Sequence, residues 1–109
     1  MMSGLTRKGT SMLRHSAMFR WREDATDEQK RAARDALAAL RDKVPSLRSL
    51  TVGFDIRRNP RNWDMLLVAD FDDQAGLEAY FANSIMKAAS DLVASVTQKE
   101  ITARVQILY

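Results

Sequence analysis

The 109-residue sequence predicts an α+β domain of the ferredoxin-like type, a β-α-β-β-α-β protomer with one antiparallel four-stranded sheet. Three observations predict this fold. Three segments alternate apolar and polar residues at the period of a strand and a fourth is a short apolar run, two regions carry apolar residues at helical spacing, and the segments follow one another in this order. A chain of this length is near the size at which a two-layer fold leaves one sheet face uncovered.

The first predicted strand runs from about Met12 to Arg22 and contains the one histidine of the chain. Strand alternation places on one face Leu13, His15, Ala17, Phe19 and Trp21. The imidazole on this apolar face has three interpretations: a buried ring bonded to a neighbour such as Tyr80, the wall of a small-molecule pocket, or an acid–base catalyst. A metal role is not expected, because one histidine without an acidic cluster makes a poor ligand set.

A helix is predicted from Thr26 to about Asp42. Thr26 and Gln29 have the spacing of a capping box, in which both side chains satisfy free amide groups at the helix start. The buried stripe recurs at helical spacing and consists of Ala33, Ala36, Leu37, Leu40 and Val44. Pro45 ends the helix because it has no amide hydrogen and restricts the residue before it.

Two strands are predicted next, "LRSLTVGFDI" and "NWDMLLVADFDD". The first has one apolar face, formed by Leu50, Val52, Phe54 and Ile56. The second is apolar on both faces, as is usual for a central strand that is covered on both sides. One face has Trp63, Met65, Leu67, Ala69 and Phe71, and the other has Leu66 and Val68. The connection carries Arg57, Arg58 and Arg61 and is expected to be a solvated turn, with a phosphate-binding patch as the alternative.

The second helical region is expected to begin at a cap, Asp72 or Asp73, and to carry Leu77, Tyr80 and Phe81 at helical spacing. Asn83 and Ser84 interrupt it. A second helical piece is expected to bury one broad face with Ile85, Met86, Ala89, Leu92, Val93 and Val96. The last strand, 100–109, alternates Ile101, Ala103, Val105 and Ile107 against Thr102, Arg104 and Gln106.

The sheet face opposite the helices is expected to expose apolar side chains, namely Met18, Leu66, Val68 and Leu108. Exposed apolar patches of this kind usually mark an interface. Two such faces stacked about a two-fold axis would bury the patch on both subunits, so the sequence predicts a homodimer. Asp64 and Asp70 share the parity of this face and are expected at the interface or the sheet edge.

Composition excludes several classes of protein. The net charge is +3, 46% of residues are apolar and 28% are charged, which is ordinary for a globular domain and makes nucleic acid an unexpected partner. The chain has no cysteine, which excludes a disulfide framework or thiol nucleophile and fits a cytoplasmic location. No apolar run approaches the roughly 20 residues that cross a bilayer. Residues 1–11 are expected to form a flexible extension without a secretory signal, which leaves 12–109 as the domain.

Four segments in order, "RHSAMFRW", "PSLRSLTVGFD", "WDMLLVADFDDQAGLEAY" and "VQILY", resemble the stress-responsive dimeric α/β-barrel (Dabb) family over about Met12 to Tyr109. The resemblance implies the same protomer and a sheet-to-sheet dimer. The family includes plant stress proteins and a polyketide cyclase. In the cyclase, a pocket between sheet and helices holds a first-strand histidine, a tyrosine and a catalytic histidine from a His-Pro-x-His motif. His15 and Tyr80 match the first two by position.

The sequence departs from that motif after Tyr80, because Asn83 and Ser84 stand in place of His-Pro and Met86 in place of the catalytic histidine. Methionine cannot serve as the base that such chemistry needs near neutral pH. We therefore expect a homodimer that binds a small hydrophobic molecule without cofactor or metal, through His15, Phe19, Leu37, Leu67, Tyr80, Phe81 and Met86. The alternative is a polyketide cyclase-like enzyme with His15 as acid/base and Tyr80 as an orienting donor. A nucleic-acid partner for the arginine loop is the weakest option.

Overall fold

The computed structural model describes residues 11–109, so the predicted extension lies outside the described residues except for Ser11. The elements are β1 (Leu13–Phe19), α1 (Asp27–Ala38), β2 (Leu47–Phe54), β3 (Met65–Phe71), α2 (Gln74–Ala82), α3 (Ser84–Val96) and β4 (Ala103–Leu108). Two short 3-10 segments, η1 (Ala39–Asp42) and η2 (Lys99–Ile101), follow α1 and precede β4. This order confirms the predicted ferredoxin-like protomer, with its second helical region in two pieces.

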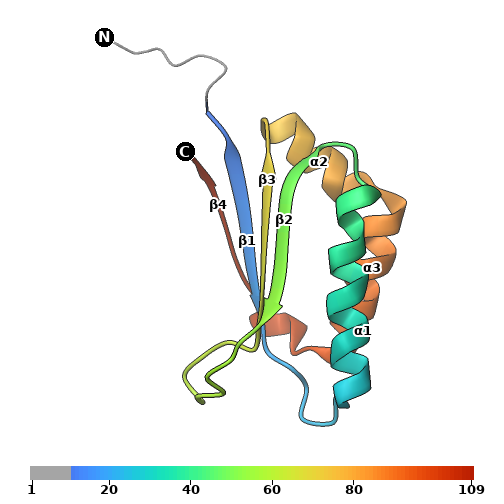
Figure 1. The fold of residues 1–109 in the computed structure, drawn as a ribbon, viewed down its shortest axis with the longest axis vertical. Coiled ribbons are helices and arrows are strands. Elements are labelled where there is room, and N and C mark those ends of the chain that lie inside the picture. The colour runs from blue at the N-terminus through green and yellow to red at the C-terminus, as the bar shows by residue number, and fades with distance from the viewer. Residues whose placement is uncertain (1–10) are drawn as a thin grey trace.

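The four strands form one antiparallel sheet in the order β2-β3-β1-β4. The helices lie on one side of this sheet, and β4 is the edge strand farthest from them (Figure 1). The register places His15 opposite Ala69 of β3 and Gln106 of β4, and Ala17 opposite Leu67 and Arg104. Residues of β4 with even numbers therefore share the helix-covered face with the buried residues of β1.

Capping side chains fix the starts of the helices, whereas α1 ends at Ala38 and reaches the predicted Asp42 only as the 3-10 segment η1. The Thr26 hydroxyl accepts a hydrogen bond from the Gln29 amide nitrogen (3.1 Å), and the Gln29 side-chain oxygen accepts one from the Thr26 amide (2.9 Å). Asp73 caps α2 by accepting from the Gly76 amide. Asn83 ends α2 and caps α3, because its side-chain oxygen accepts from the amides of Ile85 and Met86. The departure from the His-Pro-x-His pattern is thus a helix junction.

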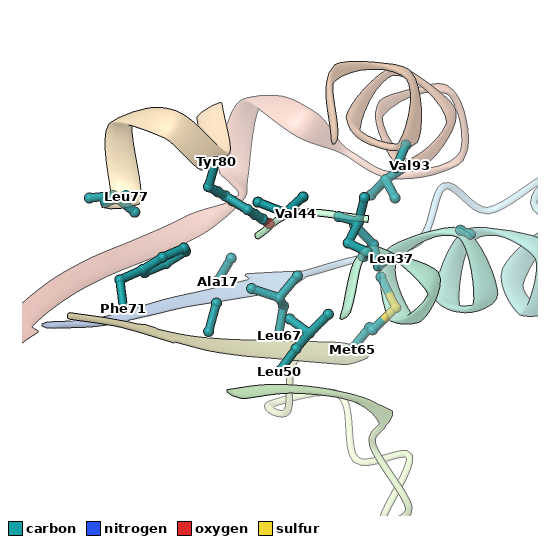
Figure 2. Close-up of a cluster of buried hydrophobic side chains, with 14 of the residues drawn as sticks. Ala17, Leu37, Val44, Leu50, Met65, Leu67, Phe71, Leu77, Tyr80 and Val93 are labelled. Atoms are coloured by element: carbon teal, nitrogen blue, oxygen red, sulfur yellow. The ribbon is translucent and has the colours of Figure 1, made fainter. Parts of the chain in front are cut away.

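The core lies between the helices and the covered face of the sheet. Figure 2 shows side chains from α1, β2, β3, α2 and α3 converging there, among them Leu37, Leu50, Leu67, Phe71 and Val93. Tyr80 points from α2 toward the sheet and is 1% exposed (Figure 2). Burial of these apolar side chains is the main term that holds helices and sheet together.

Several sequence expectations are wrong in detail. Ile56 follows the end of β2 and is 91% exposed, so it does not extend the apolar face of that strand. Ile85 and Leu92 are also exposed, because α3 buries a narrower stripe than predicted. Leu108 lies opposite Leu13, on the helix-covered side of the sheet, so it is not part of the uncovered face. Trp21 lies beyond β1 and forms an isolated bridge with Thr97.

The uncovered face of the sheet, which we call the open face, carries the opposite strand parity. Its exposed apolar residues come from β1, β3 and β4 and are Met18, Leu66, Val105 and Ile107. Beside them the guanidinium of Arg14 pairs with the carboxylate of Asp70 through two contacts of 2.9 and 3.0 Å. Ser49 donates to the same carboxylate and Arg14 donates to the hydroxyl of Tyr109. The open face is therefore an apolar patch next to one connected polar cluster.

Candidate ligand-binding cavity

A cavity of about 410 Å³ lies between the covered face of the sheet and the helices. Its walls contain every residue that the sequence proposed for ligand binding, namely His15, Phe19, Leu37, Leu67, Tyr80, Phe81 and Met86. The remaining wall residues were not predicted: Ala17, Lys87, Ser90, Asp91, Val93 and Arg104. The structure thus brings the seven candidates together and adds a charged rim.

Strand parity and helix spacing explain why these side chains converge. His15, Ala17 and Phe19 alternate along β1 and so project from one face. On α3, Met86, Ser90 and Val93 recur at intervals of four and three residues and so share a side of the helix. None of the helices in residues 11–109 lies over β4 (Figure 1), and Arg104 of this strand also lines the cavity.

The imidazole of His15 is 4% exposed and is bonded to Gln106, not to Tyr80 as the buried-ring interpretation suggested. The Nε2 amide nitrogen of Gln106 lies 2.8 Å from Nδ1 of the ring. An amide nitrogen only donates, so Nδ1 accepts and the proton of the neutral ring is on Nε2. Burial, assisted by the positive charge of Arg104, lowers the pKa of His15 below its ordinary value of 6.5. The ring is therefore uncharged at neutral pH.

His15 and Tyr80 each bring one further polar atom to the cavity wall, Nε2 of the ring and the phenol hydroxyl. Within residues 11–109 neither Nε2 of His15 nor the Tyr80 hydroxyl has a hydrogen-bond partner. In the same residues, every side-chain nitrogen or oxygen that is fully enclosed does have a partner. Both residues border the cavity. Burial raises the pKa of Tyr80 to about 12, so its phenol stays protonated. The cavity presents two uncharged donors to whatever occupies it.

Aromatic packing holds the two donors in place. The ring of His15 meets Phe81 edge-on with centroids 5.4 Å apart, and its centroid lies 6.2 Å from that of Tyr80. Tyr80 also packs against Phe71 at 5.3 Å. Such tilted and edge-to-face contacts are the preferred geometry for aromatic pairs. The donors are thus fixed before any ligand arrives.

The exposed wall residues form the rim of the cavity and carry charge. Lys87 and Asp91 come from α3, and Arg104 comes from β4. Among residues 11–109, no carboxylate lies within ion-pair distance of Lys87 or Arg104. The rim therefore has two unpaired cationic groups and one acidic group.

Two other aromatic residues of the predicted strands, Phe54 and Trp63, do not line the cavity. Phe54 packs edge-on against Trp21 at 5.8 Å, and Trp63 lies under the guanidinium of Arg20 at 4.6 Å. The loop with Arg57, Arg58 and Arg61 is exposed and borders no part of the cavity. Asp64 accepts from the Trp21 amide at 2.9 Å, which gives it a structural role near the end of β1.

The described part of the chain offers no cluster of three or more metal-ligating side chains. Among the same residues, no helix is both long and apolar enough to cross a bilayer.

Comparison with known proteins places the chain in a family. The model of the stress responsive A/B barrel domain, Dabb, matches residues 13–104. A search of the curated proteins finds no match. A dimeric ferredoxin-like protein of unknown function from Thermobifida fusca is 28% identical, with 100% of this chain and 98% of that chain covered and a TM-score of 0.76. A dimeric protein of unknown function from Bacteroides fragilis is 25% identical, with 90% and 94% covered and a TM-score of 0.70.

A hydroxynitrile lyase from Passiflora edulis has a similar structure, with a TM-score of 0.73 and coverage of 90% of this chain and 91% of that chain. At 13% identity this likeness shows the common fold alone. The family match runs from β1 to the start of β4 and includes every residue that lines the cavity. The chain therefore belongs to the stress responsive A/B barrel domain (Dabb) family.

Proposed function

We propose that two copies of this chain pair through their open faces and that each copy binds a small hydrophobic molecule in the cavity. The observation that carries the proposal is the cavity itself. It has an apolar interior and two hydrogen-bond donors, on His15 and Tyr80, for which residues 11–109 supply no acceptor.

The open face supports the pairing. Met18, Leu66, Val105 and Ile107 have exposed fractions between 36% and 55%, on a face that no helix covers. Each Å² of apolar surface removed from water stabilises an assembly by on the order of 25 cal/mol. A second copy of the same face would bury this surface on both subunits. The proteins from Thermobifida fusca and Bacteroides fragilis, both similar over most of their length, are described as dimeric.

The size and chemistry of the cavity support the ligand. Small-molecule sites commonly have volumes of roughly 300–1,000 Å³, with apolar walls and few polar groups that fix orientation. This cavity, at about 410 Å³, is at the small end of that range. Phe19, Leu37 and Leu67 supply apolar wall, and the two donors call for a ligand with hydrogen-bond acceptors.

Filling the cavity tests the ligand proposal. Ala17 is buried in the wall on β1, so Ala17→Leu adds three carbon atoms to the cavity. We expect this variant to lose binding of a neutral probe, 2-naphthalenemethanol, measured by calorimetry. Ala32→Leu makes the same change at an exposed position of α1 and should bind as the original protein does. Equal binding by Ala17→Leu, or no binding by the original protein, would contradict the proposal.

An enzymatic role is the second candidate, because His15 and Tyr80 border the same cavity. A base on His15 needs a free lone pair on Nε2, whereas the bond from Gln106 keeps the proton on that atom. Catalysis by His15 would require the Gln106 amide to turn and accept from Nδ1. The nitrogen chemical shifts of this single histidine report which ring atom carries the proton, and a proton on Nδ1 would favour the enzyme.

A further inference from the structure

We propose that the ligand of this cavity is an apolar carboxylic acid whose carboxylate lies at the rim between Arg104 and Lys87. This inference rests on the proposed binding function and adds to it the chemical class of the ligand. It makes Arg104 the residue that decides between acids and neutral molecules of the same shape.

The charge of the rim is the first support. Arg104 and Lys87 line the cavity from opposite layers, β4 on the sheet side and α3 on the helix side. Within residues 11–109 no carboxylate pairs with either, and Asp91 is the one acidic residue in the wall. With His15 neutral, the wall has a formal charge of +1, from two cationic groups and one anionic group. An anion at the rim would meet an excess of positive charge.

The position of Arg104 is the second support. It lies opposite Ala17 in the register, on the same face as His15 and two residues before Gln106. Its side chain therefore extends from the wall that also holds the donor ring. The guanidinium matches a carboxylate with two parallel hydrogen bonds, which an alcohol or amide cannot reproduce.

The interior chemistry is the third support, because its polar atoms favour a ligand with hydrogen-bond acceptors. The groups presented to the ligand by the interior are the Nε2–H of His15 and the hydroxyl of Tyr80, and both are placed to donate. The remaining interior is apolar, including Leu67, Val93 and Phe19. A cationic ligand would find two donors and two cations, whereas an acid finds an apolar interior and a cationic rim.

Paired probes of one shape test the inference. At pH 7.5, 2-naphthoate is an anion, whereas 2-naphthalenemethanol has the same ring system without charge. We expect the original protein to bind 2-naphthoate at least about tenfold more tightly, the size of one charged hydrogen-bonded contact. Arg104→Gln should reduce the ratio of the two affinities, acid to alcohol, to between one and three. Arg104→Lys should retain part of this preference. Arg57→Gln removes the same charge from the exposed loop and should leave the ratio unchanged.

A second readout comes from the ring of the single histidine. The charge of Arg104 contributes to the lowered pKa of His15, so a carboxylate beside Arg104 should raise that pKa again. Proton NMR should show this rise with 2-naphthoate and not with the alcohol.

Three outcomes would overturn the inference. If the alcohol binds as tightly as the acid, the cavity binds apolar molecules without preferring acids, and the proposed function stands alone. If Arg104→Gln keeps the full ratio, the selectivity arises elsewhere. If neither probe binds, both the inference and the proposed function fail.

Discussion

Gln106 on β4 holds His15 on β1 through a 2.8 Å contact between its Nε2 atom and Nδ1 of the ring. The two residues are also directly opposite in the strand register. An edge strand that contributes little to the core thus determines which ring atom faces the cavity and whether that atom can donate. The chemistry of the cavity depends on this contact.

Replacement of Gln106 by glutamate should reverse the chemistry of the ring. A carboxylate only accepts, so Nδ1 would carry a proton and the charged ring would be stabilised. We expect Gln106→Glu to raise the pKa of His15 and to move the proton of the neutral ring to Nδ1, both visible in histidine NMR spectra. Ala32→Glu adds the same charge at an exposed position on α1 and should leave the ring unchanged. A proton already on Nδ1 in the original protein would contradict the assignment.

Burial of His15 should make stability fall as the solution becomes acidic. Its pKa is lowered in the folded state, so below pH 6.5 the unfolded chain takes up a proton that the folded chain resists. The free energy of unfolding should therefore decrease between pH 7.5 and pH 5, and this slope should be smaller in His15→Asn. Thermal unfolding at several pH values measures it. An identical slope in both proteins would mean that His15 titrates normally in the fold.

Asp70 should act in a separate, more acidic window. Its hydrogen bonds from Arg14, and then from Ser49, hold the pKa of Asp70 at about 2, below the ordinary value of 3.8. The stability that it contributes is present above pH 3.8 and is lost as the pH falls toward 2. Asp70→Asn should be less stable than the original protein at pH 6 and should lose less on acidification to pH 2.5. If the original protein and Asp70→Asn lose the same stability between pH 6 and pH 2.5, the role of this ion pair would be contradicted.

A charge on the open face should separate the proposed dimer without unfolding the protomer. Leu66 is 42% exposed on the central strand β3, so Leu66→Glu would place a carboxylate in the interface twice, once from each copy. We expect the dissociation constant to rise by at least about 100-fold, since buried unpaired charges cost several kcal/mol. Leu92→Glu is the same change at a residue 41% exposed on α3 and should leave the dimer intact. Sedimentation velocity distinguishes the two variants.

Much of the fold could be predicted because its signals are local. Thr26 with Gln29, and Asp73 before α2, have capping side chains within three residues of the amides they satisfy. Alternation along β1 and β3 was equally informative, because both strands are paired on both sides and their covered face is apolar. The shared pocket of His15 and Tyr80 was implied by the resemblance to the Dabb family and not by these local patterns.

The charged rim could not be predicted because it depends on strand order and register. In β4 the apolar residues Val105 and Ile107 lie on the open face, and the polar residues Arg104 and Gln106 lie on the helix side. An alternating pattern alone does not show which side faces the core. Only the pairing of Gln106 with His15 makes the choice, and no local signal encodes that contact.

Native mass spectrometry of the purified protein tests the central claim most directly, because it reports the assembly and any retained ligand together. We expect a particle of two 12.4 kDa chains that carries a small apolar acid, released on denaturation and lost in Arg104→Gln. A single 12.4 kDa chain without any bound molecule, at micromolar protein concentration, would contradict both the pairing of the open faces and the occupied cavity.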